Sequence, residues 1–191
     1  MAKWNKIMVL LVFQLLYYAS ICKFQTYNGL MIDYFENCPD RTLPNRVENQ
    51  TIIQLSRDKI VVNADIEVTK ITRKLPALIK IYKCPSRSGT DCETFLRVTQ
   101  KDFCRIFTEK GQFWSAFYEK AVTPRVYCPI KKGRYMIRNG TIDLKMMLQS
   151  MPPVTDMQDY YWKFRTQLFT PDKEELFCVT SGGRLLKFRK N

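Results

Sequence analysis

The stretch KIVVNADIEVTKI, residues 59–71, gives the clearest indication of the fold. Apolar side chains recur at every second position, at Ile60, Val62, Ala64, Ile66 and Val68, and from Asn63 onward polar side chains stand between them. Period two with one polar face is typical of a half-buried β-strand. The stretch LPALIKIYKC, residues 75–84, alternates in the same way after a short turn. The sequence therefore predicts two consecutive strands that pair antiparallel.

Alternation continues toward the C-terminus. Four further segments are candidate strands: GRYMIRNG at 133–140, TIDLKMML at 141–148, DYYWKFRTQLF at 159–169 and LFCVTSG at 176–182. Turn residues such as Pro171-Asp172 separate them. Several short alternating strands with turns between them predict an all-β domain, a β-sandwich or β-cup.

The segment FCRIFTEKGQFWSAFYEK, residues 103–120, departs from this pattern. Thr99 followed by Asp102 resembles a helix capping box. Apolar residues then recur at helical spacing: Phe103, Ile106 and Phe107, and after Gly111, Phe113, Trp114, Phe117 and Tyr118. We expect a short helical segment at one open end of the sandwich, where its aromatic stripe either plugs the end as ordinary core or lines an apolar pocket.

The first 22 residues have the features of a secretory signal peptide: two lysines, an apolar run and small residues before a cleavage site. The apolar run is short for a membrane anchor. Cleavage after Cys22 leaves one domain, residues 23–191, with six cysteines, which in a secreted chain predict three disulfides. Counting alone allows fifteen pairings. Cleavage before Cys22 would leave one unpaired thiol.

The chain carries a formal charge of +13, which favours an anionic membrane surface, an acidic glycan or a receptor as partner. Export argues against nucleic acid. Lys110, Lys120 and Arg125 are the candidates to meet a polar headgroup, although solvated surface is the simpler role for them. The triplets beginning at Asn49 and Asn139 are N-glycosylation sequons, so the chain is expected to be a glycoprotein.

Catalysis is not indicated. The chain has no histidine, which removes the Ser-His-Asp and Cys-His systems, and it has no CxxC pair for zinc. Asp156 and Asp159 lie close in sequence, but a role in capping a turn accounts for them. We therefore expect no catalytic residues, no metal and no cofactor.

Longer sequence patterns carry a family resemblance. They are FENCPDRTL at 35–43, the two strands at 59–68 and 75–84, VYCPIKKGRYMI at 126–137, and the closing YWKFRTQLF and EELFCVTSGGRLLKF. With the order of the cysteines, they resemble the ML lipid-recognition superfamily and, within it, the ganglioside activator protein. The size and signal peptide are also similar to the insect chemosensory B-type proteins.

The resemblance implies a β-cup with a large apolar pocket and a non-enzymatic role in binding a lipid or hydrocarbon. It implies the disulfides Cys38–Cys178, Cys84–Cys92 and Cys104–Cys128, while a fourth bridge of the family has no counterpart between residues 105 and 127. It favours ligand contact by the aromatic stripe, and the expected pocket residues are Phe107, Phe113, Trp114, Phe117, Tyr118, Leu144, Met146, Leu148 and Trp162.

Several functions fit these expectations. The first is a secreted carrier of a hydrophobic ligand, with a role in chemosensory perception of lipid-like cues. The alternatives are a lipid-presenting activator of a hydrolase and a receptor-binding or glycan-binding module whose core is filled. Extracellular fluid is the expected location, and the lysosomal lumen is the alternative.

Overall fold

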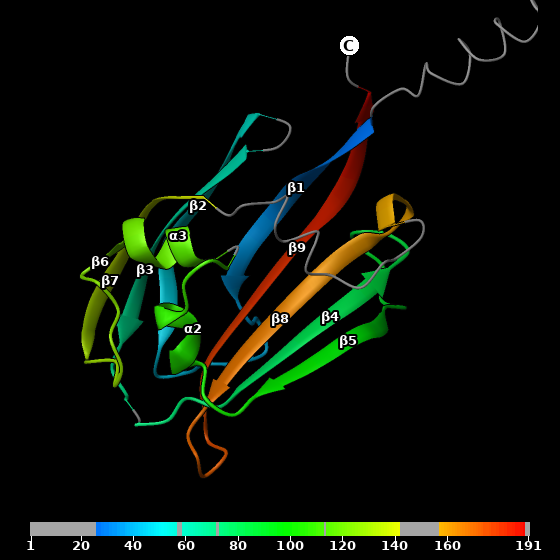
Figure 1. Ribbon diagram of the computed structural model, residues 1–191. Coiled ribbons are helices and arrows are strands. Elements are labelled where there is room, and N and C mark those ends of the chain that lie inside the picture. The colour runs from blue at the N-terminus through cyan, green and yellow to red at the C-terminus, as the bar shows by residue number, and fades with distance from the viewer. Residues whose placement is uncertain (1–25, 57–58, 72, 113, 142–156, 190–191) are drawn as a thin grey trace, which may run out of the picture. The chain divides into compact units, whose positions relative to one another are not determined.

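The structure, a computed structural model, describes residues 26–56, 59–71, 73–112, 114–141 and 157–189 (Figure 1). The predicted signal peptide and all but the first residue of the strand expected at 141–148 lie outside these ranges. The chain divides into two compact units, and the larger one, Gly29–Leu186, is described below. Within the described residues, no helix has the length and apolar character needed to cross a membrane.

Two β-sheets make up this unit (Figure 1). Sheet A has five strands in the order β1 (Thr26–Asn37), β9 (Glu175–Arg189), β8 (Tyr161–Phe169), β4 (Ala77–Cys84) and β5 (Glu93–Gln100). Sheet B has four in the order β2 (Arg46–Ser56), β3 (Lys59–Val68), β7 (Gly133–Gly140) and β6 (Val122–Thr123). The helical elements are short: α2 (Cys104–Thr108), α3 (Ser115–Lys120) and the 3-10 turn η1 (Met157–Asp159). The predicted all-β fold class is confirmed.

The predicted pairing of β3 with β4 is wrong, because the two strands belong to different sheets. β3 lies between β2 and β7, whereas β4 lies between β5 and β8. The connection from β3 to β4, here called the crossing segment, leads from sheet B to sheet A, and Asn45 binds its first residues. The Oδ1 atom of Asn45 accepts hydrogen bonds from the backbone N–H groups of Thr69 and Lys70, both at 2.9 Å. Its Nδ2 donates to the Lys70 carbonyl at 2.9 Å. A buried side chain thus takes the place of strand pairing where the chain leaves sheet B.

The helical segment exists, but the expected capping box does not. Thr99 lies within β5, opposite Leu78. Asp102 acts instead on the backbone around it, since its Oδ1 accepts hydrogen bonds from the N–H groups of Leu75 and Cys104 at 3.2 and 3.1 Å. The carboxylate therefore joins the start of α2 to Leu75, two residues before β4.

Three disulfides cross-link the unit, and they are the pairs that the resemblance implies. Cys38–Cys178 links the residue after β1 to β9, Cys84–Cys92 closes the connection between β4 and β5, and Cys104–Cys128 anchors α2. The respective Cα–Cα distances are 5.4, 4.3 and 5.8 Å.

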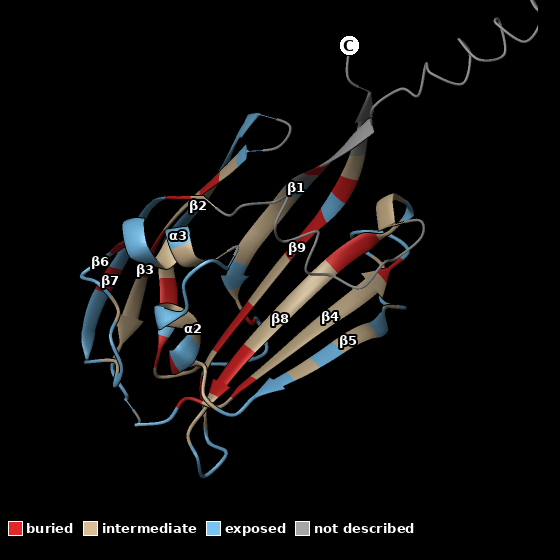
Figure 2. Ribbon diagram, in the orientation of Figure 1, coloured by how far each residue is buried: buried red, intermediate tan, exposed pale blue. Residues whose placement is uncertain are grey.

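The buried residues form two clusters, and Figure 2 shows buried positions spread along β8 and β9. The first cluster is built on sheet B with Val179 of β9: Val47, Ala64, Ala121, Val122, Tyr135, Ile137 and Val179. The second is built on sheet A and α2: Leu75, Ala77, Cys104, Leu168 and Leu176. Phe177 and Ile130 pack against both clusters. The interior between the two clusters is therefore the candidate position for a binding site.

Candidate ligand-binding cavity

A cavity of about 430 Å³ lies within the unit, lined by both sheets and both short helices. This volume falls within the range of roughly 300–1,000 Å³ found for small-molecule sites. The described lining residues are Phe35, Asn45, Ile66, Val68, Lys70, Ile71, Leu75, Ile79, Phe103, Cys104, Ile106, Phe107, Trp114, Phe117, Tyr118, Val122, Val126, Ile130, Tyr135, Ile137, Thr166, Leu168, Leu176, Phe177 and Val179. Nearly all of them are aliphatic or aromatic.

Strand alternation supplies the aliphatic walls. On sheet A, Ile79 stands opposite Thr166 across the β4–β8 pair, and both line the cavity. On sheet B, Ile66 and Val68 of β3 lie two residues apart and line it as well. Because side chains two residues apart share a face of a strand, the same period that predicts the strands also selects these lining residues.

The helices supply an aromatic wall, defined as Phe103, Phe107, Trp114, Phe117 and Tyr118. Its rings meet edge to face, with centroid distances of 5.5 Å for Phe103 and Phe107, 4.7 Å for Phe107 and Tyr118, and 5.3 Å for Phe117 and Tyr118. Such pairs contribute roughly 0.5–1.5 kcal/mol beyond the area they bury. Trp114, the residue before α3, also donates its indole N–H to the Ile106 carbonyl of α2 at 3.1 Å. The two helices are therefore held together along the cavity.

Most polar groups at the cavity already have protein partners. The Asn45 side chain is hydrogen-bonded to the backbone of Thr69 and Lys70, and the Tyr135 hydroxyl donates to the Lys131 carbonyl at 3.0 Å. Lys70 Nζ lies 2.6 Å from both carboxylate oxygens of Glu174. Burial raises the pKa of Tyr118 to about 12, so its hydroxyl stays protonated at any physiological pH. Nothing in this set activates a nucleophile or a water.

Four of the predicted pocket residues, Phe107, Trp114, Phe117 and Tyr118, line the cavity. Phe113, Leu144, Met146 and Leu148 lie outside the described residues.

Trp162 does not line this cavity. It is 3% exposed, its ring packs edge to face against Phe95 at 5.1 Å, and its indole N–H donates to the Met157 carbonyl at 2.7 Å. Strand alternation places Trp162 on the same face as Thr166, but it lies two alternation steps further toward the other end of β8.

The headgroup candidates Lys110, Lys120 and Arg125 are exposed and are not among the described lining residues. The guanidinium of Arg125 lies 5.6 Å from the ring centroid of Tyr127, itself 61% exposed. Lys70 and Ile71 were not predicted, and both are exposed while lining the cavity, so they mark a place where it reaches the surface. Their position in an irregular connection between sheets gives no periodic signal.

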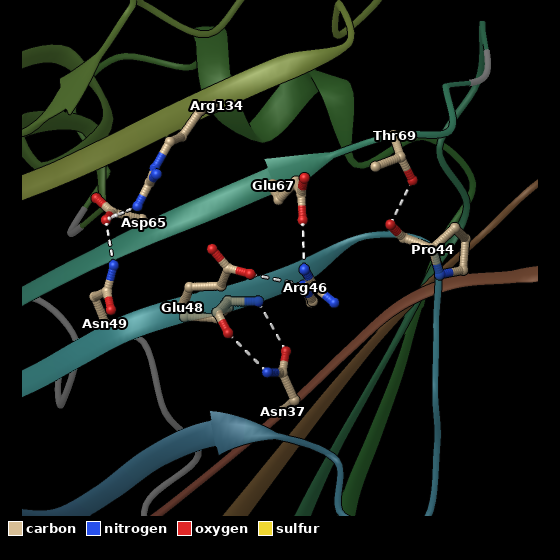
Figure 3. Close-up of polar contacts among 10 residues, drawn as sticks. Asn37, Pro44, Arg46, Glu48, Asn49, Asp65, Glu67, Thr69 and Arg134 are labelled. Atoms are coloured by element: carbon tan, nitrogen blue, oxygen red, sulfur yellow. Dashed lines mark hydrogen bonds and ion pairs between the residues drawn. The ribbon is translucent and has the colours of Figure 1, made fainter.

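A charged cluster on sheet B, shown in part in Figure 3, lies apart from the cavity lining. Asp65 of β3 is 4% exposed; its carboxylate accepts hydrogen bonds from Asn49 at 2.9 Å and from Arg134 and Arg138, both at 2.6 Å. Hydrogen bonds from Asn49, Arg134 and Arg138 hold the pKa of Asp65 well below its usual range. The cluster ties β2, β3 and β7 together, and every member is a partner of Asp65.

The two sequon asparagines are exposed and lie on β2 and β7, the strands on either side of β3. Both have positive φ, 51° for Asn49 and 52° for Asn139, a region that asparagine tolerates better than most residues. Asn49 also donates its side-chain amide to Asp65. Their glycosylation remains a prediction.

Groups of histidine, cysteine or carboxylate residues that could hold a metal ion are absent from the described part of the chain. Asp156 lies outside that part, and Asp159 is an exposed residue of η1.

No protein-family model and no curated protein matches the chain. Among solved structures, a crystal structure of chicken MD-1 complexed with lipid IVa aligns with 85% of this chain and 98% of the MD-1 chain, at 15% sequence identity and a TM-score of 0.41. Because this similarity is low, the residues of the cavity itself are the basis for assigning its role.

Proposed function

We propose that this protein is a secreted, non-enzymatic carrier of a hydrophobic ligand, a lipid or a hydrocarbon. The observation that carries the proposal is the apolar cavity of about 430 Å³ between the two buried clusters. Burial of an acyl or alkyl chain there contributes roughly 0.8 kcal/mol for each methylene removed from water. Affinity would then come from buried area, which suits a protein that picks up and releases its ligand unchanged.

Secretion is supported by the disulfides. Bridges of this kind form and persist in oxidising compartments, and three of them join the described unit. They also constrain the strands that surround the cavity, which keeps its walls in place without a ligand.

The basic surface supports a second candidate, a module that binds an acidic glycan or receptor. A formal charge of +13 favours anionic partners, and the exposed lysines and arginines are spread over several loops. The two candidates respond differently to salt, because exposed charges are screened while apolar burial is not.

The test is native mass spectrometry of the protein secreted by a eukaryotic host, followed by solvent extraction and identification of bound molecules. Stoichiometric lipid or hydrocarbon supports the proposal. Protein that is empty, and that takes up no member of a lipid and alkane panel, overturns it and leaves the basic surface as the place for function.

A cavity-filling variant sharpens this test. Ile79→Trp adds an indole on the strand face that lines the cavity, so ligand stoichiometry should fall while the protein remains folded. Leu78→Trp is the matched control, because Leu78 lies on the opposite face of the same strand, where its register partner on β8 is Gln167. Equal ligand content in the two variants would contradict a ligand held in this cavity.

A further inference from the structure

Two hydroxyl groups at the cavity lack a hydrogen-bond partner among the described residues. They belong to Tyr118 of α3 and Thr166 of β8, both of which line the cavity. The contrast with Tyr135 is direct, because that residue lines the same cavity and its hydroxyl donates to the Lys131 carbonyl. The buried side-chain atoms without a partner in the described residues are Tyr161 Oη and Arg165 Nε, so the hydroxyls of Tyr118 and Thr166 are not sealed in the core. Both residues are half-buried and line the cavity, where a bound molecule can reach them.

The ring of Tyr118 packs against two other rings of the aromatic wall. It lies edge to face with Phe107 and Phe117, and burial raises the pKa of its hydroxyl to about 12. The group therefore keeps its proton and can donate a hydrogen bond. No group of the described residues accepts a hydrogen bond from this hydroxyl, whereas a ligand oxygen in the cavity would do so.

The charge of the lining restricts what that ligand oxygen can be. Lys70 is the one ionisable cation among the described lining residues, and both oxygens of Glu174 lie 2.6 Å from its Nζ. A carboxylate or phosphate drawn into this lining would lose its water without gaining a counter-charge, which is costly. A neutral acceptor gains the hydrogen bond without that cost.

We propose that Tyr118, assisted by Thr166, selects a neutral oxygenated ligand: an aliphatic molecule whose ester, aldehyde or alcohol oxygen accepts a hydrogen bond from the tyrosine hydroxyl inside the cavity. The inference rests on the proposed carrier function and narrows its ligand class. It makes oxygenated lipids the specific ligands, and it makes plain hydrocarbons and fatty-acid anions the weaker ones.

The experiment compares wild type, Tyr118→Phe and Tyr127→Phe by displacement of N-phenyl-1-naphthylamine with methyl decanoate, decanoate or decane. Tyr118→Phe should bind methyl decanoate about tenfold more weakly, the loss of one buried hydrogen bond, and decane unchanged. Tyr127→Phe is the matched control, since it removes a hydroxyl from an exposed residue that is not among the described lining residues, and it should leave the preference for the ester intact. Thr166→Val should weaken the ester in the same direction.

Folding is checked by the melting temperature of each unliganded variant. Tyr118→Phe should melt no lower than wild type, because the hydroxyl makes no bond within the described protein. Unchanged ester binding in both Tyr118→Phe and Thr166→Val overturns the inference while the carrier function stands. Tighter binding of decanoate than of methyl decanoate overturns the neutral class. Failure of wild type to bind any of the three probes, or to take up the naphthylamine, overturns the carrier function itself.

Discussion

Removal of the Cys38–Cys178 disulfide should destabilise the protein far more than removal of Cys84–Cys92. The first bridge joins residues 140 apart in sequence, and the second joins residues only 8 apart. Cys38 and Cys178 are each 2% exposed, and the Cys38 N–H also donates to the Cys178 carbonyl at 3.1 Å. The longer bridge therefore restricts nearly the whole unfolded chain, whereas the shorter one restricts a single connection.

The loop lengths set the magnitudes. In the chain-entropy treatment, loops of these lengths correspond to about 5 kcal/mol for Cys38–Cys178 and about 2.5 kcal/mol for Cys84–Cys92 at 25 °C. For a domain of this size, 1 kcal/mol corresponds to roughly 2–4 °C in melting temperature, so the expected losses are about 10–20 °C and about 5–10 °C.

The assay is thermal unfolding by circular dichroism under non-reducing conditions, with each cysteine pair replaced by alanine and the other two bridges left intact. Scans at several heating rates distinguish an equilibrium melt from irreversible loss. Equal losses in the two double variants, or a larger loss from the short bridge, would refute the argument from loop length.

Three further results are expected. Trp114→Ala should lower ligand uptake about tenfold while the protein stays folded. Tyr127→Ala, which removes an exposed aromatic side chain, is the control. Unfolding of the Trp114→Ala variant would assign Trp114 to the core instead. Because its folded-state pKa is depressed, Asp65 stabilises the protein above about pH 4, and this contribution is lost as pH falls toward the folded value. Asp65→Asn should therefore be less stable at pH 7 and lose less stability on acidification, and parallel unfolding curves from pH 6 to 2 would contradict this. Thr141→Val should remove one glycan, seen as one step in gel mobility, without changing Asn139 and its positive φ.

The strands that the sequence predicts are those whose two faces differ in polarity. β3, β4, β7 and β8 each keep one apolar face in register over several residues, and period two reveals them. β1, β2, β5 and β6 were not predicted. In β2, irregularities between Glu48 and Thr51 and between Gln54 and Ser56 interrupt the pairing with β3. An inserted residue shifts every following side chain to the other face, so a bulged strand has no continuous alternation to detect.

Pairing and site geometry depend on contacts that local sequence does not contain. Consecutive strands usually neighbour each other, which is why β3 and β4 were expected to pair, but the connection held by Asn45 leads to the other sheet. The aromatic wall could be predicted, because helical spacing places Trp114, Phe117 and Tyr118 on one stripe. Which hydroxyls remain unpaired could not, because that depends on acceptors brought in by folding.

The cavity itself follows from where small and large side chains stand. Ala64 and Ala77 are almost fully buried in the two clusters, where short side chains allow close packing. Between the clusters, the wall is built from rings on two short helices, and their edge-to-face contacts with one another leave the central space open.

An open apolar space of this size is costly when it is empty. Because the space reaches the surface at Lys70 and Ile71, water enters it when no ligand is bound, and apolar lining left in water forgoes roughly 25 cal/mol per Å². Three disulfides offset part of such a cost by restricting the unfolded chain, and an aliphatic ligand offsets more by restoring the missing contacts. A sequence that keeps this cavity at that cost is best explained by a ligand that fills it.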